Sequence, residues 1–364
     1  MKGVTTVLAG PERIEQREFD VPDPGAGEIV AEVLRANICG SELHIWRGHH
    51  PLIVDGCVLG HEGISRVQRL GDGVDRDFAG QPLREGDRIV ATYFQMCRRC
   101  PACQRGEWNL CQNAYAFWRE PATTSPHFHG TFGTHYYVHR DQYVYRVPDN
   151  VPDRAASGAN CALSQMMYGT HLSELAAGET LLIQGAGGLG LCGIAIAKER
   201  GARVVVTEVH PDRIAAAQRF GADEVVDLSG VDTADDRVAA VHQAVGGAPD
   251  AVIDVTGVPA TFSDGVRTVR AGGRFVSIGS ISPGKLCEFD PGLYTRSGVM
   301  IRSAIRYHPW FLGRALEFLS DNAQYPWDQL VDADYSLDDV EQGLRDSAER
   351  KVARASIKVS AEAT

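Results

Sequence analysis

Two residues in the first part of the chain have side chains that could hold a transition metal. Cys39 lies in the segment CGSELH, and His61 lies in the segment GHE. A thiolate paired with a neutral imidazole favours zinc over magnesium or calcium, which prefer oxygen ligands. Ser41 and His44 follow Cys39 closely enough to pass a proton from a metal-bound group to solvent. Glu62, next to His61, could orient a ligand or coordinate the ion directly.

A third ligand is expected further along the chain, at Cys161 in the segment SGANCALSQMM. A buried cysteine without a special role is common, so Cys161 alone would be a weak signal. Together with Cys39 and His61 it becomes the predicted third ligand. Three other isolated cysteines lack such a context and are predicted to be buried or inert: Cys57, Cys192 and Cys287.

A second group of thiols is local in the sequence, and it comprises Cys97, Cys100, Cys103 and Cys111. Four thiols at such short spacings can enclose one tetrahedral zinc ion with no open position, which is typical of a structural site. The alternative is four unrelated buried cysteines, which the spacing makes improbable. The excess negative charge of four thiolates on one Zn²⁺ could be offset by Arg98, Arg99 and Arg105.

A glycine-rich turn predicts dinucleotide binding. The apolar strand ETLLIQ runs into GAGGLG at residues 185–190, and the helix LCGIAIAKERG follows. Glycines in this context allow a tight turn, a close approach of the backbone to a pyrophosphate, and close packing of helix on strand. The helix N-terminus adds N–H groups and a dipole that favour phosphate. The residues predicted to meet the cofactor here are Gly185, Gly187, Gly188, Leu189 and Gly190.

The next strand, ARVVVTE, ends in Glu208. An acid about 20 residues after the glycines should bond the hydroxyls of the adenosine ribose. A carboxylate there would repel a 2′-phosphate, so NAD is favoured over NADP. Arg213 and Gly279 are further cofactor-binding candidates, the second because it follows a strand where such sheets bind ligands.

Composition sets the broad class of the protein. A length of 364 residues favours two domains, and 44% apolar with 23% charged residues is ordinary for a globular protein. A formal net charge of −11 argues against nucleic acid as a partner. No window offers the apolar run of a membrane helix or of a signal peptide, so we expect no membrane association and a cytoplasmic location. Nine cysteines, four of them clustered, indicate metal binding rather than disulfides.

The elements that must position these residues fall into two classes, which together predict an α/β protein. Before residue 150 the pattern is mostly β, and GEIVAEVLRA alternates as a half-buried strand does. From residue 178 strands and helices alternate, which predicts a doubly wound parallel sheet. After about residue 303 the pattern breaks. We therefore expect a catalytic zinc-binding domain of residues 1–158 and 303–364, and an NAD-binding domain of residues 159–302.

Aromatic residues are frequent near the predicted metal ligands, namely Trp46, Tyr93, Phe94, Tyr115, Phe117, Trp118, Phe128 and Phe132. They could line a roomy apolar cleft, which suits an apolar ligand better than one with many hydroxyl groups. They could equally pack the core of the first domain, and the sequence leaves both alternatives open. His127 and His129 could be extra ligands, but a loop with incidental histidines is the favoured interpretation.

With these motifs in place, the chain resembles the zinc-dependent medium-chain alcohol dehydrogenases, a superfamily that includes liver alcohol, sorbitol and threonine dehydrogenases. The resemblance covers nearly the whole length and depends on CGSELH, GHE, the four-cysteine segment, GTFGTHYYV, Cys161 and GAGGLG. It implies a GroES-like catalytic domain, a Rossmann cofactor domain, and a homodimer or homotetramer. An edge strand of the cofactor sheet often forms the subunit contact in this family. Residues 298–307 could be that strand, but they could equally be an internal crossing.

The resemblance also implies roles for individual residues. Catalytic zinc would be held by Cys39, His61 and Cys161, and structural zinc by the four clustered cysteines. Glu62 would approach the metal when the water is exchanged, and Glu42 would support the ligands. Ser41 would take the alcohol proton, and His44 would complete the relay through the cofactor ribose. Lys358, in ASIKVS, would meet the pyrophosphate.

The predicted function is reversible hydride transfer between an alcohol and NAD. The alcohol is expected to be secondary, and cyclic or bulky alcohols are included in that expectation. Three alternatives differ from it. One is an aldehyde or ketone reductase that works mainly in the reductive direction. Another is a non-catalytic binding protein with a dehydrogenase fold. The third is a zinc-independent quinone or enone reductase, against which Cys39, His61 and Glu208 argue. The loop 72–87 and the aromatic segment 112–129 depart from the family pattern, and both leave the substrate open.

Overall fold

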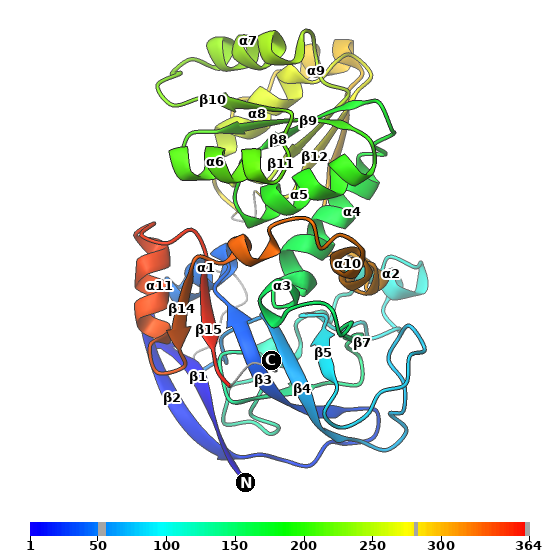
Figure 1. Ribbon diagram of the computed structural model, residues 1–364, viewed down its shortest axis with the longest axis vertical. Coiled ribbons are helices and arrows are strands. Elements are labelled where there is room, and N and C mark those ends of the chain that lie inside the picture. The colour runs from blue at the N-terminus through cyan, green and yellow to red at the C-terminus, as the bar shows by residue number, and fades with distance from the viewer. Residues whose placement is uncertain (50–55, 280–282, 361–364) are drawn as a thin grey trace. The chain divides into compact units, whose positions relative to one another are not determined.

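The computed structural model describes residues 1–49, 56–279 and 283–360, and these form two compact units. Unit 1 comprises Met1–Ser164 and His308–Thr364, and unit 2 comprises Gln165–Tyr307. The first unit is therefore assembled from both ends of the chain (Figure 1). The boundary after Ser164, rather than after residue 158 as expected, places Cys161 in the unit that also holds Cys39 and His61.

Unit 1 is built on a seven-stranded sheet in the order β14-β15-β3-β4-β5-β7, with β6 pairing on β3. Its strands are β3 (Ile29–Asn37), β4 (Glu62–Leu70), β5 (Arg88–Ala91), β6 (His135–Val138), β7 (Val144–Arg146), β14 (Ala333–Ser336) and β15 (Ala355–Lys358). A separate antiparallel pair consists of β1 (Lys2–Gly10) and β2 (Arg13–Asp20). Residues from both ends of the chain thus share one sheet.

Strand β3 was expected to be half-buried, and that prediction is wrong. Eight of its nine residues are buried, and only Glu32 is partly exposed. Its polar residue Arg35 is 1% exposed and donates to Asp334 (2.5 Å) on β14 and to Ser356 (3.0 Å) on β15. A buried guanidinium is tolerated because the Asp334 carboxylate balances its charge and Ser356 accepts a further bond.

The helices of unit 1 are short, apart from two near the C-terminus. They are α1 (Gly40–Trp46), α2 (Pro101–Gln104), α3 (Asp153–Ala156), α10 (Trp310–Asp321) and α11 (Val340–Ala348). Four single turns are η1 (Trp108–Leu110), η2 (Phe117–Arg119), η3 (Ala159–Leu163) and η4 (Trp327–Leu330), of which η3 is π-helical. The two longer helices, α10 and α11, lie within the segments HPWFLGRALEFLSDN and LDDVEQGLRDSAER.

Unit 2 is the predicted doubly wound parallel sheet. Its strands are β8 (Thr180–Gln184), β9 (Arg203–Glu208), β10 (Glu224–Asp227), β11 (Ala251–Asp254), β12 (Arg274–Ser277) and β13 (Met300–Ser303), in the order β10-β9-β8-β11-β12-β13. Its helices are α4 (Ser164–Leu172), α5 (Gly188–Glu199), α6 (Pro211–Arg219), α7 (Ala234–Val245), α8 (Pro259–Thr268) and α9 (Pro291–Ser297). The strand order reverses between β8 and β11, where such sheets bind ligands at the carboxyl ends of the strands.

Among the described residues, no helix is both long enough and apolar enough to cross a membrane.

The glycine-rich turn connects β8 to α5 and depends on close packing. Gly185 has a φ of +101°, a backbone conformation that a residue with a side chain could adopt only with strain. A Cβ added at Gly190 would lie 2.0 Å from the carbonyl oxygen of Gly185, so the helix packs on the turn only without a side chain there. A Cβ at Gly187, in contrast, would meet nothing within 4 Å. The open space at Gly187 is where a ligand could approach the backbone.

Gly190→Ala should lower the free energy of unfolding by about 1–3 kcal/mol, the usual cost of forcing a methyl group into a packed site. Alanine is more favourable than glycine in a helix by about 1 kcal/mol, which offsets only part of the energetic cost of the clash with the backbone. Thermal unfolding of the protein without added dinucleotide measures the change. Gly187→Ala, in the same turn, is the control and should unfold like the wild type. Equal stability of the Gly190→Ala variant and the wild type would contradict this packing argument.

Candidate metal and dinucleotide sites

Unit 1 brings the three predicted catalytic ligands together with Glu62. One ligand atom from each of Cys39, His61, Glu62 and Cys161 can be chosen so that all four lie within 4.8 Å of one another. His61 Nε2 is 3.3 Å from Cys161 Sγ. Two thiols, an imidazole nitrogen and a carboxylate oxygen at such separations match the donors that zinc prefers. The residues therefore fit a zinc ion.

Helix α1 positions the first ligand and supports the second. Cys39 caps the N-terminus of α1 in an extended conformation, and its N–H donates to Glu42 Oε2 at 3.1 Å. The other oxygen of Glu42 contacts His61 Nδ1. A carboxylate on one ring nitrogen fixes the tautomer, so Nε2 is left to face the ligand cluster. Glu42, which is 1% exposed, thus has the supporting contact that the resemblance implied.

Cys161 is presented by the π-helical turn η3 rather than by regular helix. The side-chain amide of the preceding residue, Asn160, donates to the backbone oxygens of His61 and Ala91, both at 2.9 Å. These bonds tie the turn to the start of β4 and the end of β5. Single π-helical turns occur frequently at functional sites. The sequence pattern gave no sign of the wider turn.

Glu62 is a fully buried carboxylate with two different environments for its oxygens. Oε2 accepts from Asn37 Nδ2 at 3.3 Å and from the guanidinium of Arg354. Oε1 has no hydrogen-bond partner among the described residues and lies 3.9 Å from His61 Nε2. Burial raises the pKa of Glu62 to about 7, although Arg354 opposes that shift. The unpaired oxygen beside the thiols and the imidazole is a further reason that a cation fits this cluster.

The charges of the ligand cluster depend on one another. The Cys161 thiol lowers the pKa of Cys39 well below its usual value, and the Cys39 thiolate in turn raises the pKa of Cys161. Burial lowers the pKa of His61, but the Glu42 carboxylate and Cys39 outweigh burial and raise it. Cys39 is therefore the preferred thiolate of the pair, and it lies beside a cationic or hydrogen-bonding imidazole.

The two residues of the expected proton path lie on α1. Ser41 and His44 are both partly exposed, and they are separated by less than one helical turn. Their positions in unit 1 do not test a path through a cofactor ribose, so the relay stays a prediction.

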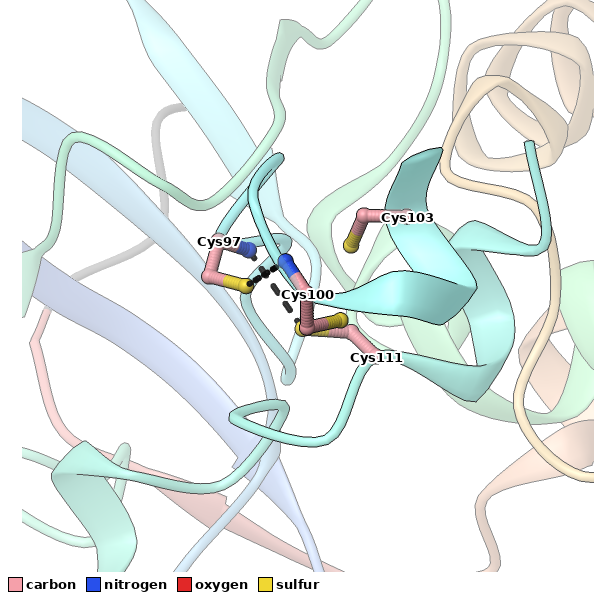
Figure 2. A group of neighbouring side chains, drawn as sticks. All are labelled: Cys97, Cys100, Cys103 and Cys111. Atoms are coloured by element: carbon pink, nitrogen blue, oxygen red, sulfur yellow. Dashed lines mark hydrogen bonds between the residues drawn. The ribbon is translucent and has the colours of Figure 1, made fainter. Parts of the chain in front are cut away.

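The four clustered cysteines converge on one point, as Figure 2 shows. Their Sγ atoms lie within 4.8 Å of one another, and all four residues are buried. The N–H of Cys97 points to Cys111 Sγ and the N–H of Cys100 to Cys97 Sγ, both at 3.4 Å. Burial raises the pKa of Cys97, but the N–H groups of Arg99 and Cys100 and other donors lower it to about 6. In contrast, burial raises the pKa of Cys103 and of Cys111. The four converging sulfurs fit a tetrahedral ion.

The arginines of this segment are less available to the thiolates than expected. The Arg98 guanidinium lies 6.0 Å from the ring centres of both Phe78 and Tyr143. Arg105 pairs with Glu107 at 2.7 Å. The main compensation at the cluster therefore comes from backbone N–H groups rather than from these two side chains.

In unit 2, Glu208 is tied to the glycine-rich turn. Its Oε2 accepts from the N–H of Ala186 at 2.9 Å, and its Oε1 accepts from Val209 and His210 at 2.7 and 3.1 Å. These N–H groups hold the carboxylate at the end of β9. A carboxylate has about four acceptor positions, so Glu208 can still accept bonds from a ligand hydroxyl.

The other cofactor-binding candidates are distributed over both units. Gly279 follows β12, and a Cβ there would lie 2.5 Å from the N atom of Gly257, so no side chain fits. Arg213 is partly exposed in the first turn of α6. Lys358 is exposed on β15 in unit 1. None of these positions by itself tests a contact with a cofactor.

The aromatic residues separate into a buried group, for which the core interpretation holds, and a partly exposed group, for which the lining of a cleft stays a prediction. Five of them are buried in the core of unit 1: Trp46, Phe94, Phe117, Phe128 and Phe132. The other three are partly exposed and gather beside the ligand His61. Tyr93 and Trp118 meet its ring edge-on, with centroids 5.1 and 5.7 Å away, and Tyr115 stacks on Trp118 at 5.4 Å. We call Tyr93, Tyr115 and Trp118 the aromatic wall.

Several contacts at the site involve residues that sequence reasoning missed. Arg354 is separated from Glu62 by 292 positions, and Asn37 by 25. No local motif signals such a pairing. Of the cysteines predicted to be buried or inert, Cys57 and Cys192 are buried, but Cys287 is exposed.

Arg354→Met should lower the free energy of unfolding by about 3–5 kcal/mol, because it leaves the Glu62 carboxylate buried without its cation. The loss should shrink as the pH falls below 7, since a protonated carboxyl needs no partner charge. Urea unfolding at pH 8 and pH 6 measures both effects. The double variant Arg354→Met/Glu62→Gln is the control and should recover part of the loss. An Arg354→Met variant as stable as the wild type at pH 8 would contradict the pairing.

Comparison with known proteins places the chain in a family. Residues 25–149 match the family model described as alcohol dehydrogenase GroES-like domain, and residues 188–321 match that described as zinc-binding dehydrogenase. The 5-exo-hydroxycamphor dehydrogenase of Pseudomonas putida is 27% identical over 93% of each chain. The L-threonine 3-dehydrogenase of Pyrococcus furiosus is 32% identical over 74% of this chain and 73% of its own.

Solved structures agree with this result. An alcohol dehydrogenase from Thermotoga maritima has a TM-score of 0.92 and 25% sequence identity, and the match covers 99% of this chain and 100% of that chain. The two domain matches follow the order of the two folds described above. The chain belongs to the zinc-dependent medium-chain dehydrogenase family, with a GroES-like and a Rossmann-type domain.

Proposed function

We propose that this oxidoreductase is a zinc- and NAD-dependent alcohol dehydrogenase acting on secondary alcohols, including cyclic or bulky ones. The observation that carries the proposal is the cluster of Cys39, His61 and Cys161, which lies directly beside the aromatic wall. The cluster supplies the three donors of a catalytic zinc site, and Glu62 offers a further carboxylate oxygen beside them. The wall supplies an apolar surface next to a ligand of that site.

Two zinc ions per chain are proposed, one at each cluster. The four-thiol cluster has no ligand position left for a substrate, so its ion would be structural. The other cluster offers three strong donors and the buried carboxylate of Glu62. Zinc held there would act as a Lewis acid that lowers the pKa of an alcohol hydroxyl.

The remaining steps fall to side chains of this protein. Glu42 holds the His61 ring so that Nε2 faces the cluster. Arg354 and Asn37 hold one oxygen of Glu62, which leaves its other oxygen directed toward the ligands. Ser41 would accept the alcohol proton, which would pass through the cofactor ribose to His44 and from there to solvent. Hydride would move from the alcohol carbon to the nicotinamide, and a ketone or aldehyde would result.

NAD is the proposed cofactor because an acid ends β9. Glu208 is fixed by three backbone N–H groups, so its carboxylate cannot easily turn away from a ligand. A 2′-phosphate would meet a negative charge there, whereas ribose hydroxyls would find an acceptor. Gly185, Gly187 and Gly190 supply the turn and the open backbone for the pyrophosphate.

The substrate class is proposed from the aromatic wall. Three rings next to a metal ligand favour an apolar alcohol over a polyol, which needs several convergent polar groups. The name of one relative gives 5-exo-hydroxycamphor, a bicyclic secondary alcohol, as its substrate. That name supports the proposal without deciding the substrate of this chain.

A homodimer or homotetramer is proposed through the edge of the cofactor sheet. The segment 298–307 contains β13, which is an edge strand of the sheet. Met300 on this strand and Ile305 just beyond it are 41% and 51% exposed. An open strand edge with exposed apolar side chains is suited to pairing with a second copy.

Cys39→Ser or His61→Ala should abolish alcohol turnover and lower the zinc content from two ions per chain to one, because each removes a donor of the catalytic site only. Binding of NAD, followed by quenching of protein fluorescence, should be largely retained. Cys57→Ser, at a cysteine outside both clusters, is the control. Full turnover in either ligand variant would refute the proposed mechanism.

Trp118→Ala should reduce kcat/KM for a bulky cyclic alcohol about two- to tenfold more than for propan-2-ol, since one large ring of the wall is lost. An NAD⁺-coupled assay over primary, linear secondary, cyclic and polyol substrates measures this ratio, and the reverse assay with ketones tests the reductive direction. Trp327→Phe, at a buried tryptophan away from the wall, is the control. A preference for polyols, or a ratio unchanged by Trp118→Ala, would contradict the substrate assignment.

A further inference from the structure

Two histidines lie behind the aromatic wall and pack against one another. The rings of His129 and His139 are parallel to within 4°, with centroids 5.8 Å apart. The centroid of the Phe117 ring lies 5.0 Å from that of His139, and the two rings are inclined by 27°. Phe117 is buried, and it precedes Trp118 within the single turn η2. A row of rings therefore leads from His129 through His139 to Phe117, which is next to Trp118 of the wall in the sequence.

Neither histidine is used as a charged group or as part of a metal cluster. His129 is 2% exposed, its Nε2 bonds the carbonyl of Thr124 at 3.3 Å, and its Nδ1 has no partner among the described residues. Nε2 of His139 likewise has no partner there. Burial lowers the pKa of His139 to about 4 and lowers that of His129 below its usual value. Both rings are therefore neutral at the pH of an ordinary assay and pack as aromatic groups.

The segment 112–129 needs such support because it has little regular structure of its own. Turn η2 has only three residues, and its closing backbone bonds are Arg119 N–H to Ala116 (3.3 Å) and Glu120 N–H to Phe117 (3.2 Å). A second histidine anchor lies further along. The His127 ring stacks on Phe19 at 4.5 Å and 2°, and its Nδ1 is 2.8 Å from the carbonyl oxygen of Ala122.

We propose that His129 and His139 are positioning residues that hold η2, and with it the Trp118 ring, beside His61, and so set the selectivity for bulky alcohols. The proposal rests on the proposed function, because it assumes that the wall faces the substrate. It assigns His129 a role other than the two weighed from the sequence, an incidental loop histidine, which the sequence favours, or an extra metal ligand. Within this pair, the flat neutral ring of His139 supports η2 directly, because it is the ring that contacts Phe117.

The test compares kcat and KM for cyclohexanol and propan-2-ol in the zinc-loaded enzyme. His139→Ala should raise KM for cyclohexanol about two- to tenfold, the effect expected from one lost aromatic pair, and should leave kcat and KM for propan-2-ol nearly unchanged. His139→Phe restores a ring without a titratable nitrogen and should restore the wild-type KM. His242→Ala, a histidine substitution in α7 of unit 2, is the matched control.

Hydrogen exchange supplies a second measurement that does not depend on activity. The peptide covering residues 112–129 should exchange faster in His139→Ala and return to the wild-type rate in His139→Phe, with zinc content unchanged in both. Should His139→Ala fail to fold, Phe117→Leu removes the same ring contact with less loss of volume. It should give the same shift in KM in the same direction.

The outcomes separate this proposal from the substrate assignment. A changed alcohol preference in Trp118→Ala, together with wild-type kinetics and exchange in His139→Ala, would overturn the positioning role and leave the proposed function standing. A shift in His139→Ala that His139→Phe does not reverse would overturn the role of the ring. An unchanged preference in Trp118→Ala would remove the wall from substrate selection, and the inference would fall with it.

Discussion

The buried ion pair between Glu62 and Arg354 is the constraint on which the candidate catalytic site depends. Glu62 begins β4 directly after the ligand His61, and Arg354 directly precedes β15. The pair therefore fixes two segments of the same sheet that are 292 positions apart. A buried carboxylate without a cation would be costly, so the arginine must be in place for the ligand segment to fold as observed. The pair is one of the contacts that join the two ends of the chain within unit 1.

The same pairing leaves one carboxylate oxygen without a partner among the described residues, and this oxygen faces the ligands. Around it, each ligand is held by a different kind of local structure. Cys39 caps a helix, His61 is oriented by Glu42, and Cys161 lies in a π-helical turn tied down by Asn160. No single element could present these three side chains, so the site exists only in the folded unit.

Features encoded by neighbouring residues could be predicted from the sequence. The four-thiol cluster spans 15 positions, from Cys97 to Cys111, and the glycine-rich turn spans six, so spacing alone predicted that the first would converge and that the second would join a strand to a helix. The alternation of strands and helices in unit 2 was visible for the same reason. Cys161 could be predicted as a ligand only because Cys39 and His61 had already indicated a zinc site that needs a third donor.

Features that depend on distant contacts could not be predicted. The burial of β3 depends on the partners of Arg35, which lie about 300 and 320 positions away. The aromatic residues near the site have similar sequence surroundings, yet Phe117 is buried while its neighbour Trp118 joins the wall. Stacking of His129 on His139 arises only when the segment 112–129 folds back on the strand that ends near residue 138. In irregular segments the direction of the side chains does not repeat at a fixed interval, so the sequence pattern does not predict which side chains are buried.

X-ray absorption at the zinc edge of the purified protein tests the central claim most directly. Two zinc sites, one with four sulfur donors and one with two sulfurs and an imidazole, predict an average of about three sulfurs per zinc at ~2.3 Å and a nitrogen shell at ~2.0–2.1 Å. Cys39→Ser should then leave a spectrum of four sulfurs and no nitrogen. A wild-type spectrum that already shows four sulfurs and a single ion per chain would contradict the account.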